Sequence, residues 1–271
     1  MRTIHIFDTV AVVISRIVGC NCTLLQRLSA KRTLMNPNTR YGNARREVAF
    51  ALMDVGAVLT SESIHPRIVV RRGAQGMERG FKLKHHEKNP NAPLSPLFFN
   101  LRIPSNPEPG PLTPAIVDLA ARCMRHVQLE KKLEPDAMVG VPRAGDPFAQ
   151  ALARLAGTPC IALNKHEYGT TRCIAGLKGH VPGSIRKVLP IDDLVTKAYS
   201  KREAILNLRE ASFEVTDVVV LIDHEQGGRE ELAKLGCTLY SVFTATELLD
   251  EYVKVGKLNP GIRDAYRAIP V

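Results

Sequence analysis

Two adjacent carboxylates, Asp192 and Asp193, follow an apolar run at 187–191. Side by side at the end of a strand, such a pair can hold a ribose diol, either directly or through Mg²⁺. Thr196 and Ser200 follow in a short polar segment that opens onto an expected helix, and hydroxyls and backbone N–H groups at a helix N-terminus bind phosphate. The residues therefore indicate a site for a phosphorylated sugar. A solvated acidic turn is the alternative that they leave open.

The segments around the acidic pair alternate between apolar β-branched runs and amphipathic helical patterns. Strands are expected at 137–141, 160–163, 187–191, 217–222 and 238–242, and helices at 114–127, 145–156, 199–211, 229–235 and 245–255. This alternation is typical of an α/β protein with a parallel twisted sheet flanked by helices. Ligands of such sheets bind at the carboxyl ends of the strands, which is where the acidic pair is expected. Pro190 is unusual there, because a proline removes a hydrogen-bond donor from the strand.

The preceding part of the chain is expected to form a smaller region with shorter elements. A polar loop is expected at 36–43, a helix at 45–55, and strands at 67–70, 80–84 and 97–101. A polar insert at 85–94 carries His85 and His86. These adjacent histidines are expected to be solvated rather than to bind a metal.

Composition and charge narrow the classes of protein that fit. The 271 residues carry 37 Lys and Arg against 27 Asp and Glu, a net charge of +10, and 45% of them are apolar. No uncharged apolar run is long enough for a transmembrane helix. The basic excess fits either a nucleic acid or a small polyanion, and the chain lacks the aromatic-lined basic stripe of a single-strand binder. Six cysteines without a CxxC spacing are expected to be reduced thiols.

Four motifs, taken together, resemble the orotate phosphoribosyltransferase family of type I phosphoribosyltransferases. They occupy residues 81–100, 140–147, 188–200 and 219–228, within a resemblance that extends over about 47–255. The segment 188–200 is similar to the family's phosphoribosyl pyrophosphate (PRPP) signature. The segment from Asp223 to Gly228, Asp-His-Glu-Gln-Gly-Gly, resembles the family's Asp-Arg-Glu-Gln-Gly-Gly turn and is the most specific match.

The resemblance implies an activity and a fold. The activity is Mg²⁺-dependent transfer of ribose 5-phosphate from PRPP to orotate, which yields orotidine 5′-phosphate and pyrophosphate in the synthesis of UMP. The fold is the type I phosphoribosyltransferase fold with a small N-terminal hood region.

The resemblance also implies a role for each matching residue. Asp192 and Asp193 would hold the ribose diol, with Mg²⁺ bound through PRPP and at these acids. Lys165 and His166 would complete the catalytic set from a lid loop at 165–172. The phosphates of PRPP would be bound by Thr196, Lys197, Ala198, Tyr199, Ser200, Arg143, Ala144 and Gly145. The orotate-binding residues would be Lys84, Phe98, Phe99 and His224.

Three positions depart from the family's pattern. Ala198 stands where the family has glycine, His224 stands where it has an orotate-binding arginine, and the lid, with Gly169 as its hinge, is shorter. Histidine lacks the bidentate fork of arginine and is mostly neutral near pH 7. The departures leave two alternatives: a catalytically degenerate relative that binds PRPP or a nucleotide in a regulatory role, and a transferase for another base.

The remaining expectations concern organisation and location. Residues 1–34 are basic and nearly free of acids, which fits a transit-like, disordered or misassigned extension before Met35. Residues 35–271 are expected to form one phosphoribosyltransferase-like domain, with a hood at about 45–110 and a core at about 111–256, and no room for a fused decarboxylase. The expected protein is a cytoplasmic homodimer without a nucleic-acid or membrane partner, or an organellar one if residues 1–34 are a transit peptide.

Overall fold

The structure is a computed structural model that describes residues 37–73, 76–83, 86, 89–168, 171–179 and 181–269. The expected leader at 1–34 and the expected site residue Lys84 lie outside the described residues. The chain divides into two compact units, residues 1–43 and 44–271. All the elements that carry the candidate site belong to the second unit.

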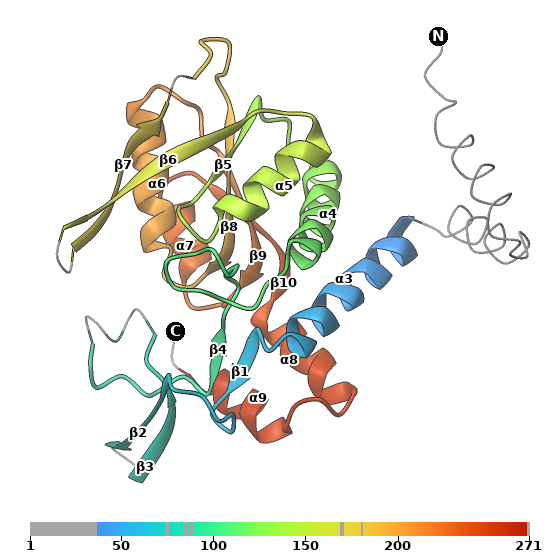
Figure 1. Ribbon diagram of the computed structural model, residues 1–271, viewed down its shortest axis with the longest axis vertical. Coiled ribbons are helices and arrows are strands. Elements are labelled where there is room, and N and C mark those ends of the chain that lie inside the picture. The colour runs from blue at the N-terminus through green and yellow to red at the C-terminus, as the bar shows by residue number, and fades with distance from the viewer. Residues whose placement is uncertain are drawn as a thin grey trace, which may run out of the picture. The chain divides into compact units, whose positions relative to one another are not determined.

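A six-stranded sheet forms the centre of this unit (Figure 1). Its strands lie in the order β10 (Thr238–Thr244), β9 (Asp217–Asp223), β8 (Val188–Val195), β5 (Ala137–Gly140), β6 (Cys160–Tyr168) and β7 (Thr171–Lys178). The first five are parallel, as the alternation of elements predicts. β7, which was not expected, pairs antiparallel with β6 and forms this edge of the sheet.

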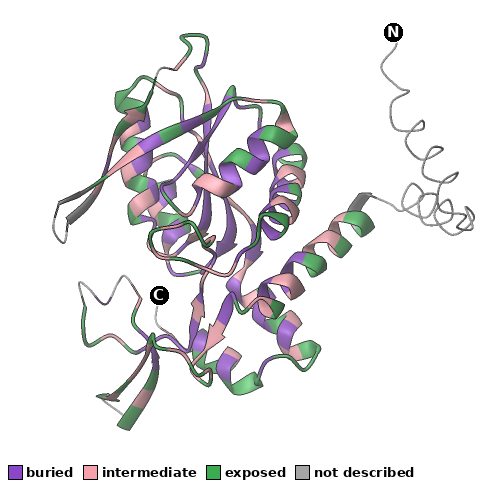
Figure 2. Cartoon of the chain, viewed as in Figure 1, coloured by how far each residue is buried: buried purple, intermediate pink, exposed green. Residues whose placement is uncertain are grey.

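Helices cover both faces of the sheet. α4 (Pro114–Glu130) and α5 (Asp146–Ala156) pack on one face, and α6 (Tyr199–Glu210) and α7 (Gly228–Ala233) on the other (Figure 1). Right-handed crossovers place α5 and α6 on opposite faces, because the chain leaves β5 and β8 in opposite directions along the sheet. The strands between the helices are buried, as Figure 2 shows. The prediction of a doubly covered α/β sheet is confirmed.

Pro190 lies within β8, a central strand that is buried along most of its length. The parallel pairing of β8 with β9 begins at Ile191, opposite Val219, directly after the proline. On the amino-terminal side of Pro190, Val188 donates instead to the carbonyl of Glu214, at 3.0 Å. Pro190 lies opposite Val139 of β5, and towards β9 it falls between two pairings, where a missing donor disrupts little.

The N-terminal and C-terminal segments of the unit pack together. The N-terminal elements are α3 (Pro37–Asp54), β1 (Val58–Thr60), the hairpin of β2 (Ile68–Gly73) and β3 (Gly76–Phe81), and β4 (Leu97–Phe99), which pairs with β1. The C-terminal helices α8 (Ala245–Lys254) and α9 (Pro260–Arg267) follow β10. The buried Tyr252 of α8 donates its hydroxyl to the carbonyl of Ala49, at 2.8 Å, which joins α8 to α3.

Three local expectations are wrong. Residues 37–43, expected in a polar loop, belong to α3. α9 was not expected at all. His86, expected to be solvated, is 5% exposed, and its Nδ1 lies 2.9 Å from the backbone nitrogen of Leu83 and its Nε2 3.1 Å from the carbonyl oxygen of Pro93. Its ring thus bridges the two ends of the insert. Within the described chain, no helix is long and apolar enough to cross a membrane.

Candidate active site

The carboxyl ends of β5, β8 and β9 carry the segments from which the site is built. These strands are neighbours and parallel, so the segments that follow them, at 141–145, 196–198 and 224–227, emerge at one edge of the sheet. From β5 the chain runs to β6 on one side, whereas β8 lies on the other. The strand order therefore reverses between β5 and β8, and such a switch point is where open α/β sheets bind ligands.

Two glycines allow these segments to pack against one another. A Cβ at Gly145 would lie 2.3 Å from the carbonyl oxygen of Ile191 and 2.9 Å from Oδ1 of Asp192. A Cβ at Gly228 would lie 2.5 Å from the carbonyl oxygen of Thr196. Backbone therefore meets backbone at both points, and the expected pyrophosphate loop lies directly against the acidic pair.

The acidic pair lies inside β8 rather than after it, because pairing with β9 continues through Asp192 opposite Val220 and Leu194 opposite Ile222. Both acids are buried, at 3% exposure for Asp192 and 9% for Asp193. The N–H of Asp193 donates to Oδ1 of Asp192 at 2.9 Å, and the N–H of Leu194 donates to Oδ1 of Asp193 at 2.7 Å. Backbone donors thus hold each carboxyl group in place.

Lys201, which the sequence analysis did not single out, pairs with this site. Its Nζ lies 2.5 Å from Oδ2 of Asp192 and also donates to the carbonyl of Leu194. Lysine is seldom buried, yet this side chain is only 7% exposed. The spacing of Lys201 from the buried residues Ala204, Ile205 and Leu208 places it on the core-facing stripe of α6, and this pattern is visible in the sequence.

Burial and the neighbouring Asp192 raise the pKa of Asp193 well above its usual range, whereas Lys201 lowers it. Two carboxylates so close together and so far from water resist ionising together. The pair therefore retains a proton more readily than two solvated acids would.

Three helices begin at this edge without a side-chain cap. The N-cap residues are Gly145 for α5, Ala198 for α6 and Gly227 for α7, and none of the three supplies a capping hydrogen bond from its side chain. By contrast, α4, α8 and α9 are capped by the side chains of threonine or asparagine. The uncapped N-termini of α5 and α6 thus present backbone N–H groups to an anion between β5 and β8.

Ala198 adopts a left-handed conformation, with φ of 54°. This is the conformation that the family's glycine would adopt without strain, and an L-residue there costs on the order of 1 kcal/mol. Ala198 is 3% exposed, so its Cβ is packed within the phosphate segment. The departure from glycine therefore retains the backbone shape at a cost in conformational energy.

We expect Ala198→Gly to stabilise the protein by up to about 1 kcal/mol, because strain relief exceeds the extra entropy lost by glycine. The midpoint of thermal unfolding would rise by roughly 2–4 °C for each kcal/mol in a chain of this size. Ala211→Gly is the matched control, since Ala211 ends the same helix at φ of −79° and should lose stability as glycine. A lower midpoint of thermal unfolding for Ala198→Gly than for wild type would show that the left-handed backbone at Ala198 is not strained.

Three cations surround a carboxyl group on the other side of the switch point. Asp146, the first residue of α5, is desolvated by burial and repelled by Asp192, which together raise its pKa to about 6. Arg143, Lys178 and Lys165 act in the opposite direction and lower it. Asp146 therefore adds a titratable carboxyl group beside the acidic pair, and Lys178 adds a positive charge near it. Asp146 follows the expected pyrophosphate loop in the sequence, whereas only the fold brings Lys178 to it.

The expected lid loop is a β-hairpin in the described residues. β6 extends through Lys165 and His166, which pair with Ile174 and Cys173 of β7. Figure 1 shows the two strands as an arm at the sheet edge. The positive charge of Lys165 acts on Asp146, whereas the neighbouring His166 is exposed. Gly169 lies outside the described residues.

No model of a protein family matches the chain. The orotate phosphoribosyltransferase of Saccharolobus solfataricus is 30% identical to it over 169 residues, which is 61% of this chain and 79% of that relative. The chain belongs to the orotate phosphoribosyltransferase family. The bovine uridine 5′-monophosphate synthase is 31% identical over 168 residues, which is 61% of this chain and 33% of that protein.

Two solved structures share the fold of this chain. The UMP synthase of Leishmania donovani matches 82% of this chain and 41% of its own, with 28% identity and a TM-score of 0.61. The orotate phosphoribosyltransferase of Aeropyrum pernix matches 78% of this chain and 99% of its own, with a TM-score of 0.54, and at 23% identity it supports the fold alone. The expected type I fold is confirmed.

The described residues that are expected to bind orotate do not form one surface. Phe98 is half-buried and stacks on Phe81, with 5.6 Å between ring centroids, whereas the buried Phe99 meets the ring of His224 edge-on at 5.1 Å. Adjacent residues of β4 point to opposite faces, which explains this division. Phe98 is thus the more accessible of the two to a base.

His224 is 3% exposed, and its Nδ1 lies 2.9 Å from the hydroxyl oxygen of Tyr266 in α9. Burial and the positive charge of Lys201 lower the pKa of His224 to about 4. The ring is therefore neutral at pH 7 and supplies no positive charge to a carboxylate. Its packing depends on α9, which sequence reasoning missed.

The other residues that are expected to bind phosphate lie in the segments after β5 and β8. Thr196, Lys197 and Ser200 are half-buried, and Tyr199 is 45% exposed at the first turn of α6. Ala144 is half-buried and Arg143 is exposed in the loop before α5.

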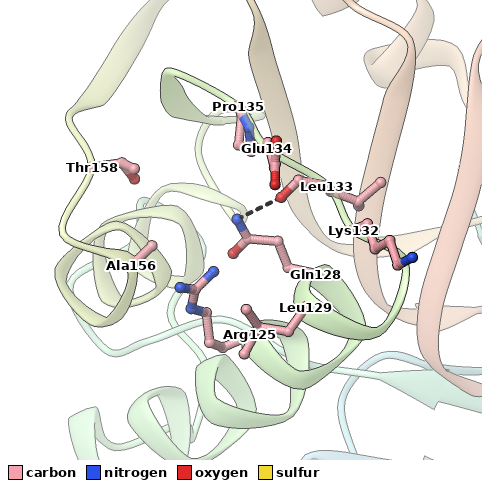
Figure 3. Close-up of a pocket in the computed structure, with 9 residues that line it drawn as sticks. All are labelled: Arg125, Gln128, Leu129, Lys132, Leu133, Glu134, Pro135, Ala156 and Thr158. Carbon is pink, nitrogen blue, oxygen red and sulfur yellow. Dashed lines mark hydrogen bonds between the residues drawn. The ribbon is translucent and has the colours of Figure 1, made fainter.

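A separate pocket of about 330 Å³ lies at the opposite end of the sheet (Figure 3). It is lined by Arg125, Gln128, Leu129, Lys132, Leu133, Glu134, Pro135, Ala156 and Thr158. Pro135 precedes β5 and Thr158 precedes β6, so the pocket adjoins the amino ends of these strands. It includes none of the expected site residues.

Proposed function

We propose that the protein transfers the 5-phosphoribosyl group of PRPP to orotate, producing orotidine 5′-phosphate and pyrophosphate in pyrimidine biosynthesis. The observation that carries this proposal is the arrangement at the switch point, where the acidic pair of β8 lies between the uncapped N-termini of α5 and α6. That arrangement offers acceptors for sugar hydroxyls and donors for the phosphates on either side. Membership of the orotate phosphoribosyltransferase family supports orotate as the base.

In the proposed reaction, the bond between C1 of the ribose and the pyrophosphate oxygen breaks, and its electron pair leaves with the pyrophosphate. A nitrogen of orotate then donates its lone pair to C1 and forms the new bond, while the N–H bond of that nitrogen breaks and its proton passes to the departing pyrophosphate. The protein's part is to position three groups and to stabilise charge as it develops. The acidic pair accepts hydrogen bonds from the ribose hydroxyls, and the first turn of α6 with Thr196 and Ser200 binds the 5′-phosphate. Arg143 and Lys165 neutralise the pyrophosphate.

The acidic pair is poorly suited to coordinate Mg²⁺ directly. Both oxygens of Asp192 already accept hydrogen bonds, one of them from an ammonium group. In the part of the chain that the structure describes, no three residues among His, Cys, Asp and Glu are placed to hold a metal ion. We therefore propose that Mg²⁺ enters on the phosphates of PRPP, where it would neutralise the leaving pyrophosphate.

We also propose that the protein works in the cytoplasm as a homodimer. Neither a nucleic acid nor a membrane has a part in the proposed reaction.

The decisive test is an assay of pure protein with PRPP, Mg²⁺ and orotate, followed by the absorbance of orotate. Turnover is expected, and the double variant Asp192→Asn with Asp193→Asn should abolish it. Absence of turnover with PRPP binding retained would favour the degenerate, regulatory alternative. Turnover that survives the double variant would refute the role of the acidic pair.

A transferase for another base is the second candidate, and His224 is the observation that favours it. The neutral, buried ring offers no counter-ion for the carboxylate of orotate. The same assay with uracil in place of orotate tests this candidate. Faster transfer to uracil than to orotate would replace orotate as the proposed substrate.

Asp146 predicts how substrate binding depends on pH. Its pKa is raised to about 6, so above that pH its carboxylate adds a negative charge beside the proposed pyrophosphate position. We expect Asp146→Asn to lower the KM for PRPP roughly threefold to tenfold at pH 7.5 and to change it little at pH 5. Variant and wild type are compared at the same pH, because the phosphates of PRPP also titrate near pH 6. A higher KM at pH 7.5 would show instead that the carboxylate helps to bind substrate.

A further inference from the structure

The acidic pair of β8 has a positively charged partner, Lys201, which lies just after the segment 188–200 that resembles the family's motif. Among the described residues, Lys201 is the one whose ammonium group pairs with Asp192, with Nζ 2.5 Å from Oδ2. We propose that Lys201 is a positioning residue that supplies the counter-ion of the acidic pair from within the protein, so that the pair receives ribose hydroxyls and binds no metal ion directly. This inference rests on the proposed transferase function.

Two features of its position make the positive charge of Lys201 unfavourable for the free energy of folding. It is the third residue of α6, and a cation in the first turn of a helix opposes the helix dipole. It is also 5% exposed, and burying an unpaired ammonium is strongly unfavourable. Both costs are offset by one feature, the carboxylate of Asp192. The lysine and the acid therefore depend on each other.

The hydrogen bonds show how the two acids differ. Oδ1 of Asp192 accepts the N–H of Asp193, and Oδ2 accepts the ammonium of Lys201, so each oxygen of Asp192 has one donor from the protein and a lone pair for a ligand. Oδ1 of Asp193 accepts the N–H of Leu194. Asp193 also shares a hydrogen bond with the side chain of Asp192. The ammonium of Lys201 therefore lies on Asp192, whereas Asp193 is held by a backbone N–H and by its acidic neighbour.

A divalent cation at the pair would have to displace the ammonium or lie beside it. Mg²⁺ needs oxygen ligands in a nearly ideal octahedron, and a fixed ammonium at the same carboxylate both blocks a ligand position and repels the ion. Removing the ammonium should open the pair to a metal. This consequence can be measured without substrate.

The test uses Mn²⁺, followed by its paramagnetic resonance signal, on the whole chain without PRPP. Wild type is expected to bind Mn²⁺ at the acidic pair at least tenfold more weakly than Lys201→Met, which should gain a site there. Arg202→Met is the matched control, because it removes an exposed cation from the next position of the same helix and should leave binding unchanged. Equal Mn²⁺ affinity in wild type and Lys201→Met would overturn the proposal.

A double-mutant cycle in urea provides a second readout. Lys201→Met alone leaves two buried acids without a counter-ion, and the unfolding equilibrium should shift towards the unfolded state by roughly 100-fold or more. Adding Asp192→Asn removes the acid that the lysine pairs with, and most of the loss should be recovered. If Lys201→Met does not fold, the double variant with Asp192→Asn should still fold. Failure of both variants to fold would refute the pairing of Lys201 with Asp192, as would additive effects of the two substitutions on the unfolding free energy. Neither readout uses orotate, so each outcome is independent of the test of the proposed function.

Discussion

Replacing Gly145 with alanine is expected to lower the rate of phosphoribosyl transfer by roughly 100-fold, since a displacement of about 1 Å in a positioning element has effects of this size. The added Cβ would lie 2.3 Å from the carbonyl oxygen of Ile191 and 2.8 Å from that of Val141, both backbone atoms that cannot rotate away. The loop before α5 must then move from the acidic pair. Steady-state kinetics with PRPP and orotate measure the effect.

Stability should fall as well, by about 1–3 kcal/mol, the usual cost of forcing an atom into a packed region. Gly183→Ala is the matched control, because a Cβ at Gly183 would meet no atom within 4 Å. It should leave both rate and unfolding free energy nearly unchanged. Wild-type activity in Gly145→Ala would mean that the contact between this loop and β8 has no part in catalysis.

Asp193→Asn is expected to make the protein more stable and nearly inactive. The folded protein holds the proton of Asp193 to a higher pH than the unfolded chain does, because burial and Asp192 raise its pKa. Ionisation of Asp193 therefore opposes folding, and wild-type stability falls as pH rises from about 4 towards the raised pKa. Asparagine does not titrate, so the variant should unfold at a higher temperature than wild type at pH 7. Loss of the carboxylate should slow phosphoribosyl transfer roughly 100-fold.

Thermal unfolding between pH 4 and pH 8, together with the orotate assay, measures both effects. Asp136→Asn is the contrasting control, because the N–H groups of Arg186 and Lys187 lower the pKa of Asp136. A carboxylate with a lowered pKa stabilises the fold above its ordinary range, so that variant should lose stability at pH 7. A destabilised Asp193→Asn would show that the ionised pair is favourable in the folded protein.

The elements of the sheet could be predicted because their signals are local. Val-Val-Val-Leu-Ile in β9 and the apolar residues of β5 are read directly as buried parallel strands. The acidic pair was found for the same reason, since it follows an apolar run. Its place inside β8 was not, because only pairing with β9 extends the strand past Asp193.

What escaped prediction depends on contacts between distant segments. The arm formed by β6 and β7 is supported from α6, where Glu203 accepts the N–H of Ile174 at 2.7 Å and Asn207 accepts that of Gly176 at 3.1 Å. The sequence around 165–172 does not indicate that Glu203 and Asn207 hydrogen-bond to the arm. Likewise, His224 is neutral because α9 and Phe99 enclose it, and no local pattern shows that. For Lys201, the sequence pattern predicts that it lies on the buried face of α6, but it does not predict that its partner is Asp192.

The uncapped helix N-termini at the switch point have a consequence for the protein without substrate. An alanine in place of a capping side chain, as at Ala198 of α6, costs a helix about 1 kcal/mol, and a glycine, as at Gly145 of α5, costs roughly a few tenths of that. An anion that binds both N-termini stabilises the folded protein by an amount that grows with the logarithm of its concentration relative to its dissociation constant. PRPP would then act as a folding ligand, and the protein's lifetime against proteolysis would follow the supply of its own substrate.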